Sequence, residues 1–256
     1  MDPYSGRPPA KQTSPWAYVG VGCGLAVLLA LIAIVGFTYL VYRQGKEMTA
    51  GFRDPKMRES KTREVLPYTT LPAGYYAGGA MSIPFLMDFA VFTDEEPTAG
   101  QGPDQGPDQG NFRDRSFIFM NMRHMRDNRE KMERYLRGEA PAPEDGAWSK
   151  SNVNFHAKEL IKRGQLEVGG KTLLWQASRG EITHHGQNHD GVVTMVLPEC
   201  GDNRLRFGVW IGPAPVATPA AGAGKPVNPI NYTGTPADPA ALQEFLGHFR
   251  LCEGKG

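Results

Sequence analysis

Three histidines and an aspartate stand close together in the second half of the chain, and their side chains are of the kinds that bind metals. The residues are His184, His185, His189 and Asp190. Imidazole and carboxylate groups are ligands of zinc and copper, and side chains on the two sides of a hairpin tip can converge on one ion. The residues between and after them are turn formers, so the segment also fits a solvated polar turn between two strands. No other segment supplies further ligands, so we favour the turn and keep a zinc or copper site as the alternative.

A second group with metal-binding chemistry lies in the middle of the chain, at Met120, Met122, His124 and Met125. Thioether sulfur and imidazole together suit Cu(I). However, Ile118, Met120 and Met122 alternate along a predicted strand, which is the pattern of side chains that share one buried face. We therefore interpret these methionines as core residues.

Two cysteines, Cys200 and Cys252, lie outside the apolar amino-terminal region and are predicted to form a disulfide. Cys200 follows a predicted strand and Cys252 follows the last predicted helix, so the bond would tie that helix to the sheet. Neither a cysteine nor a serine stands in a recognisable nucleophile turn, and no glycine-rich loop has the spacing that cradles a phosphate. We expect no cofactor, and we favour a noncatalytic role over a hydrolase with dispersed catalytic residues.

A hairpin is predicted around Gly169 and Gly170. Paired glycines accept the positive φ angles that tight hairpins require, and strand-like segments flank them at 165–168 and 171–179. These two segments therefore pair with each other.

Two further strands follow the histidine segment, over 193–197 and 205–211, because apolar residues alternate along both. In the second of them, Arg204 and Arg206 stand on the face opposite the apolar residues. Trp210 shares that opposite face, which is either a contact patch or a second buried face.

The chain closes with a predicted helix after a long excursion, rich in Ala, Gly and Pro, over residues 213–236. Asp238 is a suitable cap and Pro239 suits the first helical position. One face of this helix is apolar and must pack on the sheet. That face is formed by Leu242, Phe245, Leu246 and Phe249.

The first half of the folded region predicts a buried strand or strand pair over 81–92, broken near Pro84, and another strand over 116–122. Asp127 and Glu130 form a capping-box-like start of a helix. Gly138 can end that helix. Between these strands, residues 101–110 repeat Gln-Gly-Pro-Asp and form a loop.

The amino-terminal part contains an uncharged apolar run from Ala17 to Val41, bracketed by Trp16 and Tyr42. About 20 apolar residues cross a bilayer, so the run predicts one transmembrane helix over 16–42. It is longer than the apolar region of a secretory signal, which spans about 7–15 residues, and it ends in large side chains. We expect a retained, single-pass signal anchor that contacts the lipid bilayer through residues 16–42.

Two observations bear on the orientation of this anchor, and they point in opposite directions. Lys and Arg accumulate on the cytoplasmic side of a membrane helix, and two precede the predicted helix whereas seven follow it within 43–64. Taken alone, that count places the carboxyl-terminal domain in the cytoplasm. A large folded domain can be translocated despite such charge, and a lone cysteine pair fits an oxidising compartment. We therefore expect an extracytoplasmic domain.

Composition divides the chain into four parts and excludes one class of function. The 28 Lys and Arg residues are scattered among 27 Asp and Glu residues, for a net charge of +1, which leaves no electrostatic footprint for nucleic acid. The predicted parts are a short polar tail over 1–15, the transmembrane helix over 16–42, a charged stalk over 43–64 and a single α+β domain over 65–256.

The order of these elements resembles the PsbP/Mog1-type α/β domain over most of residues 71–252. The local features that carry the resemblance are Gly169, Gly170 and the helix over 242–249. The resemblance implies a twisted antiparallel β-sheet flanked by helices, used for binding and assembly more than for catalysis, with no shared catalytic motif. The excursion over 213–236 departs from the usual tight ending of that family.

We therefore predict a membrane-anchored, noncatalytic binding or assembly module of the cell envelope, with a protein partner. The alternative is an envelope domain that handles zinc or copper through the histidine segment at 184–190.

Overall fold

A computed structural model of the chain describes residues 54–83, 85–97, 115–123, 125–141, 153–184, 187–215 and 230–253. All of these residues belong to the second of the two units into which the chain divides, residues 48–256. The predicted transmembrane helix over 16–42 lies outside the described residues. Within those residues, no helix combines the length and the apolar character that crossing a bilayer requires.

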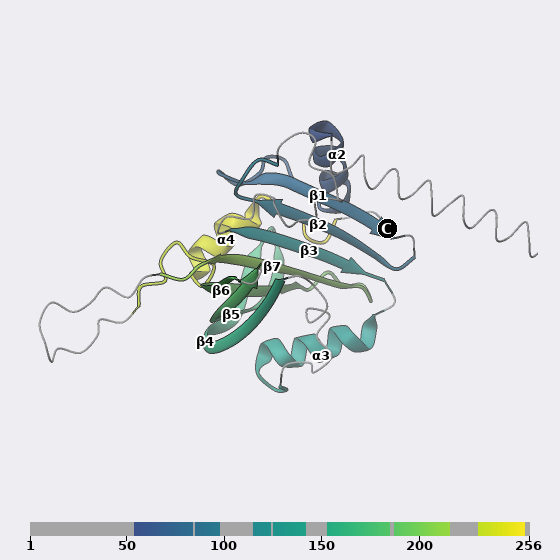
Figure 1. Ribbon diagram of the computed structural model, residues 1–256. Helices are drawn as coiled ribbons and strands as arrows, with labels where there is room; N and C mark the ends of the chain where they lie inside the picture. Colours follow the sequence, from purple (N-terminus) through teal and green to yellow (C-terminus); the bar gives the residue numbers. More distant parts are fainter. Residues whose placement is uncertain are drawn as a thin grey trace, which may run out of the picture. The chain divides into compact units, whose positions relative to one another are not determined.

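One antiparallel sheet of seven strands organises this unit (Figure 1). Neighbouring strands follow the order β1-β2-β3-β7-β6-β5-β4, so β1 and β4 form the two edges. The fold is of the α+β class, as predicted. The strands are β1 (Tyr76–Ile83), β2 (Met87–Thr93), β3 (Ser116–Met122), β4 (Val153–Val168), β5 (Lys171–His184), β6 (Gln187–Pro198) and β7 (Leu205–Pro213).

Hydrophobic cores cover both faces of the sheet. One core joins strand residues such as Phe92 and Trp175 to α2 (Pro55–Val65) and α4 (Pro239–Gly247). The other lies on the opposite face, where Phe207 and its neighbours meet Leu136 of α3 (Arg126–Arg137). The sheet is therefore enclosed between helices on its two sides.

Strand β7 is buried along almost its whole length because its alternate residues enter the two different cores. The ring of Trp210 stacks on that of Phe245 from α4, with centroids 4.2 Å apart. Its indole N–H donates to the Tyr75 hydroxyl at 2.7 Å. Of the two interpretations of this face, the second buried face is correct and the contact patch is wrong.

Helix α4 forms as its sequence predicts. The Asp238 carboxylate accepts a hydrogen bond from the N–H of Ala240 at 3.1 Å, and Pro239 occupies the first helical position. Leu242, Phe245 and Leu246 are buried against the sheet.

Helix α3 ends where predicted but begins differently. Gly138 stops it in the left-handed conformation, with φ of 79°. Met125 stands at the amino-terminal cap without a side-chain hydrogen bond, so the capping box predicted from Asp127 and Glu130 is wrong. Glu130 instead pairs with Arg126 one turn earlier, at 3.3 Å.

Part of the predicted stalk belongs to the folded domain. Residues 55–65 form α2, which is capped by Asp54 and packs along β1 and β2. Arg58, Thr62 and Val65 of this helix are buried. The packed domain therefore begins before residue 65, where composition alone placed the boundary, because a helix rich in charge still buries one face.

The predicted hairpin at Gly169 and Gly170 joins β4 to β5, and both glycines have positive φ, 57° and 72°. Strand β4 extends back to Val153, far beyond the segment that the sequence identified. Two shifts in register interrupt its pairing with β5, one between Ala157 and Glu159 and one between Leu160 and Lys162. Such bulges break the alternation by which a strand is recognised in a sequence.

Candidate functional site

The histidine segment lies at the turn between β5 and β6. The main chains of His184 and Gln187 pair with each other, and His189 pairs with Ile182 further along the hairpin. His189 and Asp190 are exposed on β6, and the Asp190 carboxylate accepts a hydrogen bond from Arg179 at 2.6 Å. His185 and the side chain of His184 lie outside the described residues. Within the part that is described, no three His, Cys, Asp or Glu side chains are placed to hold a metal, so the site at all four residues stays a prediction.

A metal-binding experiment separates the two interpretations of this segment. We expect the chain and its His185→Ala/His189→Ala variant to retain equal amounts of zinc and of copper in equilibrium dialysis. The physical reason is that Asp190 is already committed to Arg179 and would have to leave it to bind an ion. One equivalent of metal retained by the native chain and lost from the variant would instead establish the metal site.

The methionine group separates into core residues and a helix start. Met120 is buried and Met122 is partly buried in the core on the α3 side of the sheet. Met125 precedes α3, and its sulfur accepts a hydrogen bond from the Asn128 amide at 3.1 Å. His124 lies outside the described residues. Met120 and Met122 are thus core residues, as their alternation predicts.

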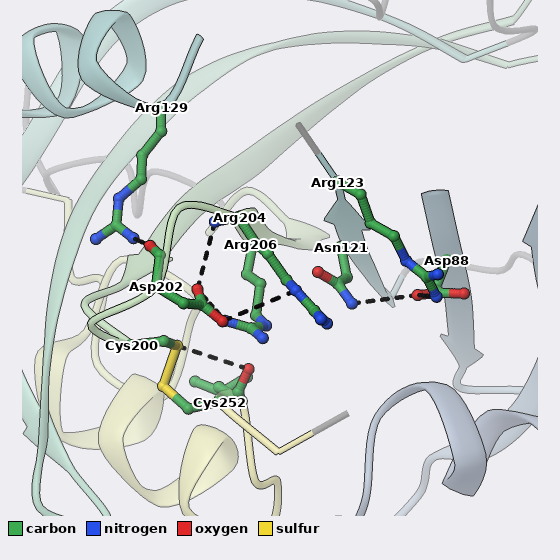
Figure 2. Close-up of polar contacts among 10 residues, drawn as sticks. Asp88, Asn121, Arg123, Arg129, Cys200, Asp202, Arg204, Arg206 and Cys252 are labelled. Carbon is green, nitrogen blue, oxygen red and sulfur yellow. Dashed lines mark hydrogen bonds and ion pairs between the residues drawn. A yellow bond between two sulfur atoms is a disulfide. The ribbon is translucent and has the colours of Figure 1, made fainter. Parts of the chain in front are cut away.

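Cys200 and Cys252 form a disulfide, with an S–S distance of 2.07 Å. Cys200 lies in the loop between β6 and β7, and Cys252 follows α4 (Figure 2). The bond therefore ties the segment after α4 to this loop, as predicted.

Asp202, two residues after Cys200, contacts three arginines (Figure 2). Its carboxylate accepts from Arg206 at 2.7 Å and from the N–H of Arg204 at 3.4 Å, while its carbonyl oxygen accepts from Arg129 of α3 at 2.6 Å. Partial burial disfavours the ionised carboxylate, but the hydrogen bonds and charges of Arg206 and Arg204 outweigh it and lower the pKa of Asp202. Because the pKa is lower in the folded chain, this stabilisation is present above the ordinary aspartate pKa and is lost as the pH falls through the lowered value.

A row of polar residues crosses three strands inside the apolar face that α2 and α4 cover. Asp88 of β2 lies opposite Asn121 of β3, which lies opposite Arg206 of β7. All three are buried. The Asp88 carboxylate accepts from the Asn121 amide and from Arg123, each at 3.2 Å (Figure 2). We call Asp88, Asn121, Arg123 and Arg206 the polar row.

The buried atoms of the polar row lie between strands and out of reach of solvent. Asn121 Oδ1, Arg123 Nε and Arg206 Nε are buried and have no hydrogen-bond partner among the residues that the structure describes. Solvent does not reach these atoms, so a dissolved ligand cannot reach them either. Sequence reasoning did not single out this set, although Asp88 and Asn121 within apolar strands are the kind of buried polar residue that needs a partner.

An open pocket lies on the other face of the sheet, between α3 and the strands β4 and β5. Its volume is about 260 Å³. Tyr135 contributes from α3, Arg163 from β4, and Gln176 and Ser178 from β5. Sequence reasoning missed this set because its members come from three elements, α3, β4 and β5, that only the tertiary structure brings together.

The chain matches no protein-family model, and no curated protein sequence shows significant similarity to it. The proposed function therefore rests on the fold and on these sites.

Proposed function

We propose that this chain is a single-pass membrane protein whose α+β domain serves as a binding or assembly module on the extracytoplasmic side of the membrane. The amino-terminal apolar run over 17–41 supplies the anchor. The proposed domain is of the PsbP/Mog1 type. The antiparallel sheet flanked by helices, with α4 following its last strand, supports this proposed domain type.

The Cys200–Cys252 disulfide is the main support for the proposed extracytoplasmic location of the domain. Disulfides persist in oxidising compartments and are rare in the cytosol. A retained anchor followed by a cross-linked domain is the organisation of an extracytoplasmic module.

The basic residues after the anchor oppose this orientation less strongly than their number implies. Four of the seven basic residues after the anchor lie within α2, a helix of the folded domain. Arg58 is buried there, and Arg63 pairs with Glu59 at 2.8 Å. Charges that fold into a domain are translocated with it and contribute less to orientation than a free flank does.

Membrane fractionation and protease accessibility test this function. We expect the full chain to stay in the membrane pellet after carbonate extraction and its folded domain to be digested by protease added to intact spheroplasts. A variant without residues 16–42 should leave the pellet, because the remaining chain lacks the apolar run. Copurification of one stable partner from solubilised membranes would support assembly.

Two results would contradict the proposal. The first is release of the full chain by carbonate, which would remove the anchor. The second is a domain that protease reaches only after the spheroplasts are lysed, which would place it in the cytoplasm.

A further inference from the structure

The pocket between α3 and the strands β4 and β5 has a polar floor within an otherwise apolar face. Gln176 and Ser178 are each 5% exposed and line it. The Gln176 amide donates to the Tyr135 hydroxyl at 2.8 Å. Among the described residues, none forms a hydrogen bond with the Ser178 hydroxyl. A hydroxyl on a largely buried residue that lines an open pocket and has no partner among the described residues is available to a ligand.

The pairing of β4 with β5 brings one cation to this floor. In the register, Leu160 lies opposite Ser178 and Arg163 lies opposite Gln176. Residues directly opposite in an antiparallel pair share a face of the sheet. Because the bulge between Leu160 and Lys162 adds a residue, Leu160 and Arg163 share the α3 face although they are three apart.

Arg163 is a cation that lines the pocket. It forms no ion pair with any residue of the described ranges, whereas Lys158 pairs with Glu181 at 3.1 Å. Glu159, the acidic residue of the lining, lies opposite Arg179 in the register and therefore on the other face of the sheet.

The end of α3 holds Arg163 in position. A Cβ at residue 138 would overlap the guanidinium group, so Gly138 leaves the space that this group occupies. The carbonyl end of a helix carries partial negative charge and favours a cation beside it. The exposed Arg163 side chain thus lies beside the end of α3, and among the described residues no carboxylate pairs with its charge.

We propose that this pocket binds a small organic oxyanion. Arg163 pairs with its carboxylate or phosphate group, and the Ser178 hydroxyl and the Gln176 amide bind its polar remainder. The planar guanidinium group suits both oxyanions, since it can donate two parallel hydrogen bonds. A volume of about 260 Å³ lies just below the ~300–1,000 Å³ typical of ligand pockets, so the ligand is a small acid and not a nucleotide. Binding here does not require the membrane anchor, so this proposal and the proposed function can fail separately.

Ligand-observed NMR on the full chain in mild detergent tests the proposal, with succinate, inorganic phosphate and uncharged succinamide as probes. We expect saturable binding of succinate, phosphate or both, and none of succinamide. Arg163→Gln should weaken binding about tenfold or more, because a hydrogen-bonded charge is lost. Ser178→Ala should weaken binding less than Arg163→Gln does. It tests the contribution of the Ser178 hydroxyl without altering Arg163.

Lys162→Gln is the matched control, because it removes the neighbouring positive charge from a residue that lies opposite Ala177 and not in the pocket. It should leave binding unchanged. Phosphate binding with the same response to the variants would identify phosphate as the oxyanion. Absence of saturable binding of both oxyanions, equal binding of succinamide, or equal loss in Lys162→Gln would each overturn the proposal.

Discussion

Replacing Asp88 with alanine should destabilise the folded domain by about 3 kcal/mol. The Asp88 side chain is 4% exposed and is paired with Arg123, whose side chain is 23% exposed. Removing one partner of a buried ion pair leaves the other charge without compensation, which typically costs about 3–5 kcal/mol. The partial exposure of Arg123 places the expected loss at the lower end of that range. The Asn121 amide also loses its acceptor.

Urea unfolding followed by pulse proteolysis of the full chain in mild detergent measures this loss. Asp88→Asn should cost less, because its amide oxygen still accepts a hydrogen bond. Glu244→Ala removes an exposed carboxylate from α4 and should change stability by less than about 0.5 kcal/mol. An Asp88→Ala loss as small as that of Glu244→Ala would show that the polar row does not stabilise the sheet.

Local patterns predicted the elements whose stabilising features lie within a few residues of each other. The hairpin at Gly169 and Gly170, the end of α3 at Gly138 and the start of α4 at Asp238 all follow from the backbone or side-chain chemistry of single positions. The alternation of β7 was also visible, because its pairing is free of bulges in the central part of the sheet.

Elements that depend on distant contacts were harder to predict. Helix α2 is charged along its length, and only its packing on β1 shows that Arg58 and Thr62 face inward. The burial of Trp210 likewise depends on Phe245 and Tyr75, which are far from it in the sequence. The alternation of residues identifies the two faces of a strand, but the elements that cover each face decide which one is exposed to solvent.

The candidate sites show the same limit. The polar row requires three strands in one register, and the oxyanion pocket requires α3 to lie over the paired residues Arg163 of β4 and Gln176 of β5. Neither arrangement has a sequence motif. The disulfide was predictable because only one pair of cysteines lies outside the apolar run.

The loop between β6 and β7 connects the layers on the two sides of the sheet. Its Cys200 is bonded to Cys252 after α4, and the carbonyl of its Asp202 accepts a hydrogen bond from Arg129 of α3. Asp202 also pairs with the buried Arg206 of the polar row. The disulfide therefore restrains a loop that is joined to the segment after α4 and hydrogen-bonded to α3 on the other side of the sheet.

Opening this disulfide should produce the other large loss of stability. The cysteines are 52 residues apart, and closing a loop of that length stabilises the folded state by about 4 kcal/mol in the chain-entropy model. We expect reductant, or the Cys200→Ser/Cys252→Ser variant, to lower the urea midpoint of the full chain by a corresponding amount. On a denaturing gel, reductant should also slow the migration of the chain that keeps both cysteines. It should affect neither stability nor mobility in the double variant, which controls for other effects of the reagent. Two free thiols in the native chain before reduction, or a stability loss below about 1 kcal/mol, would show that the bond does not restrain the loop as described.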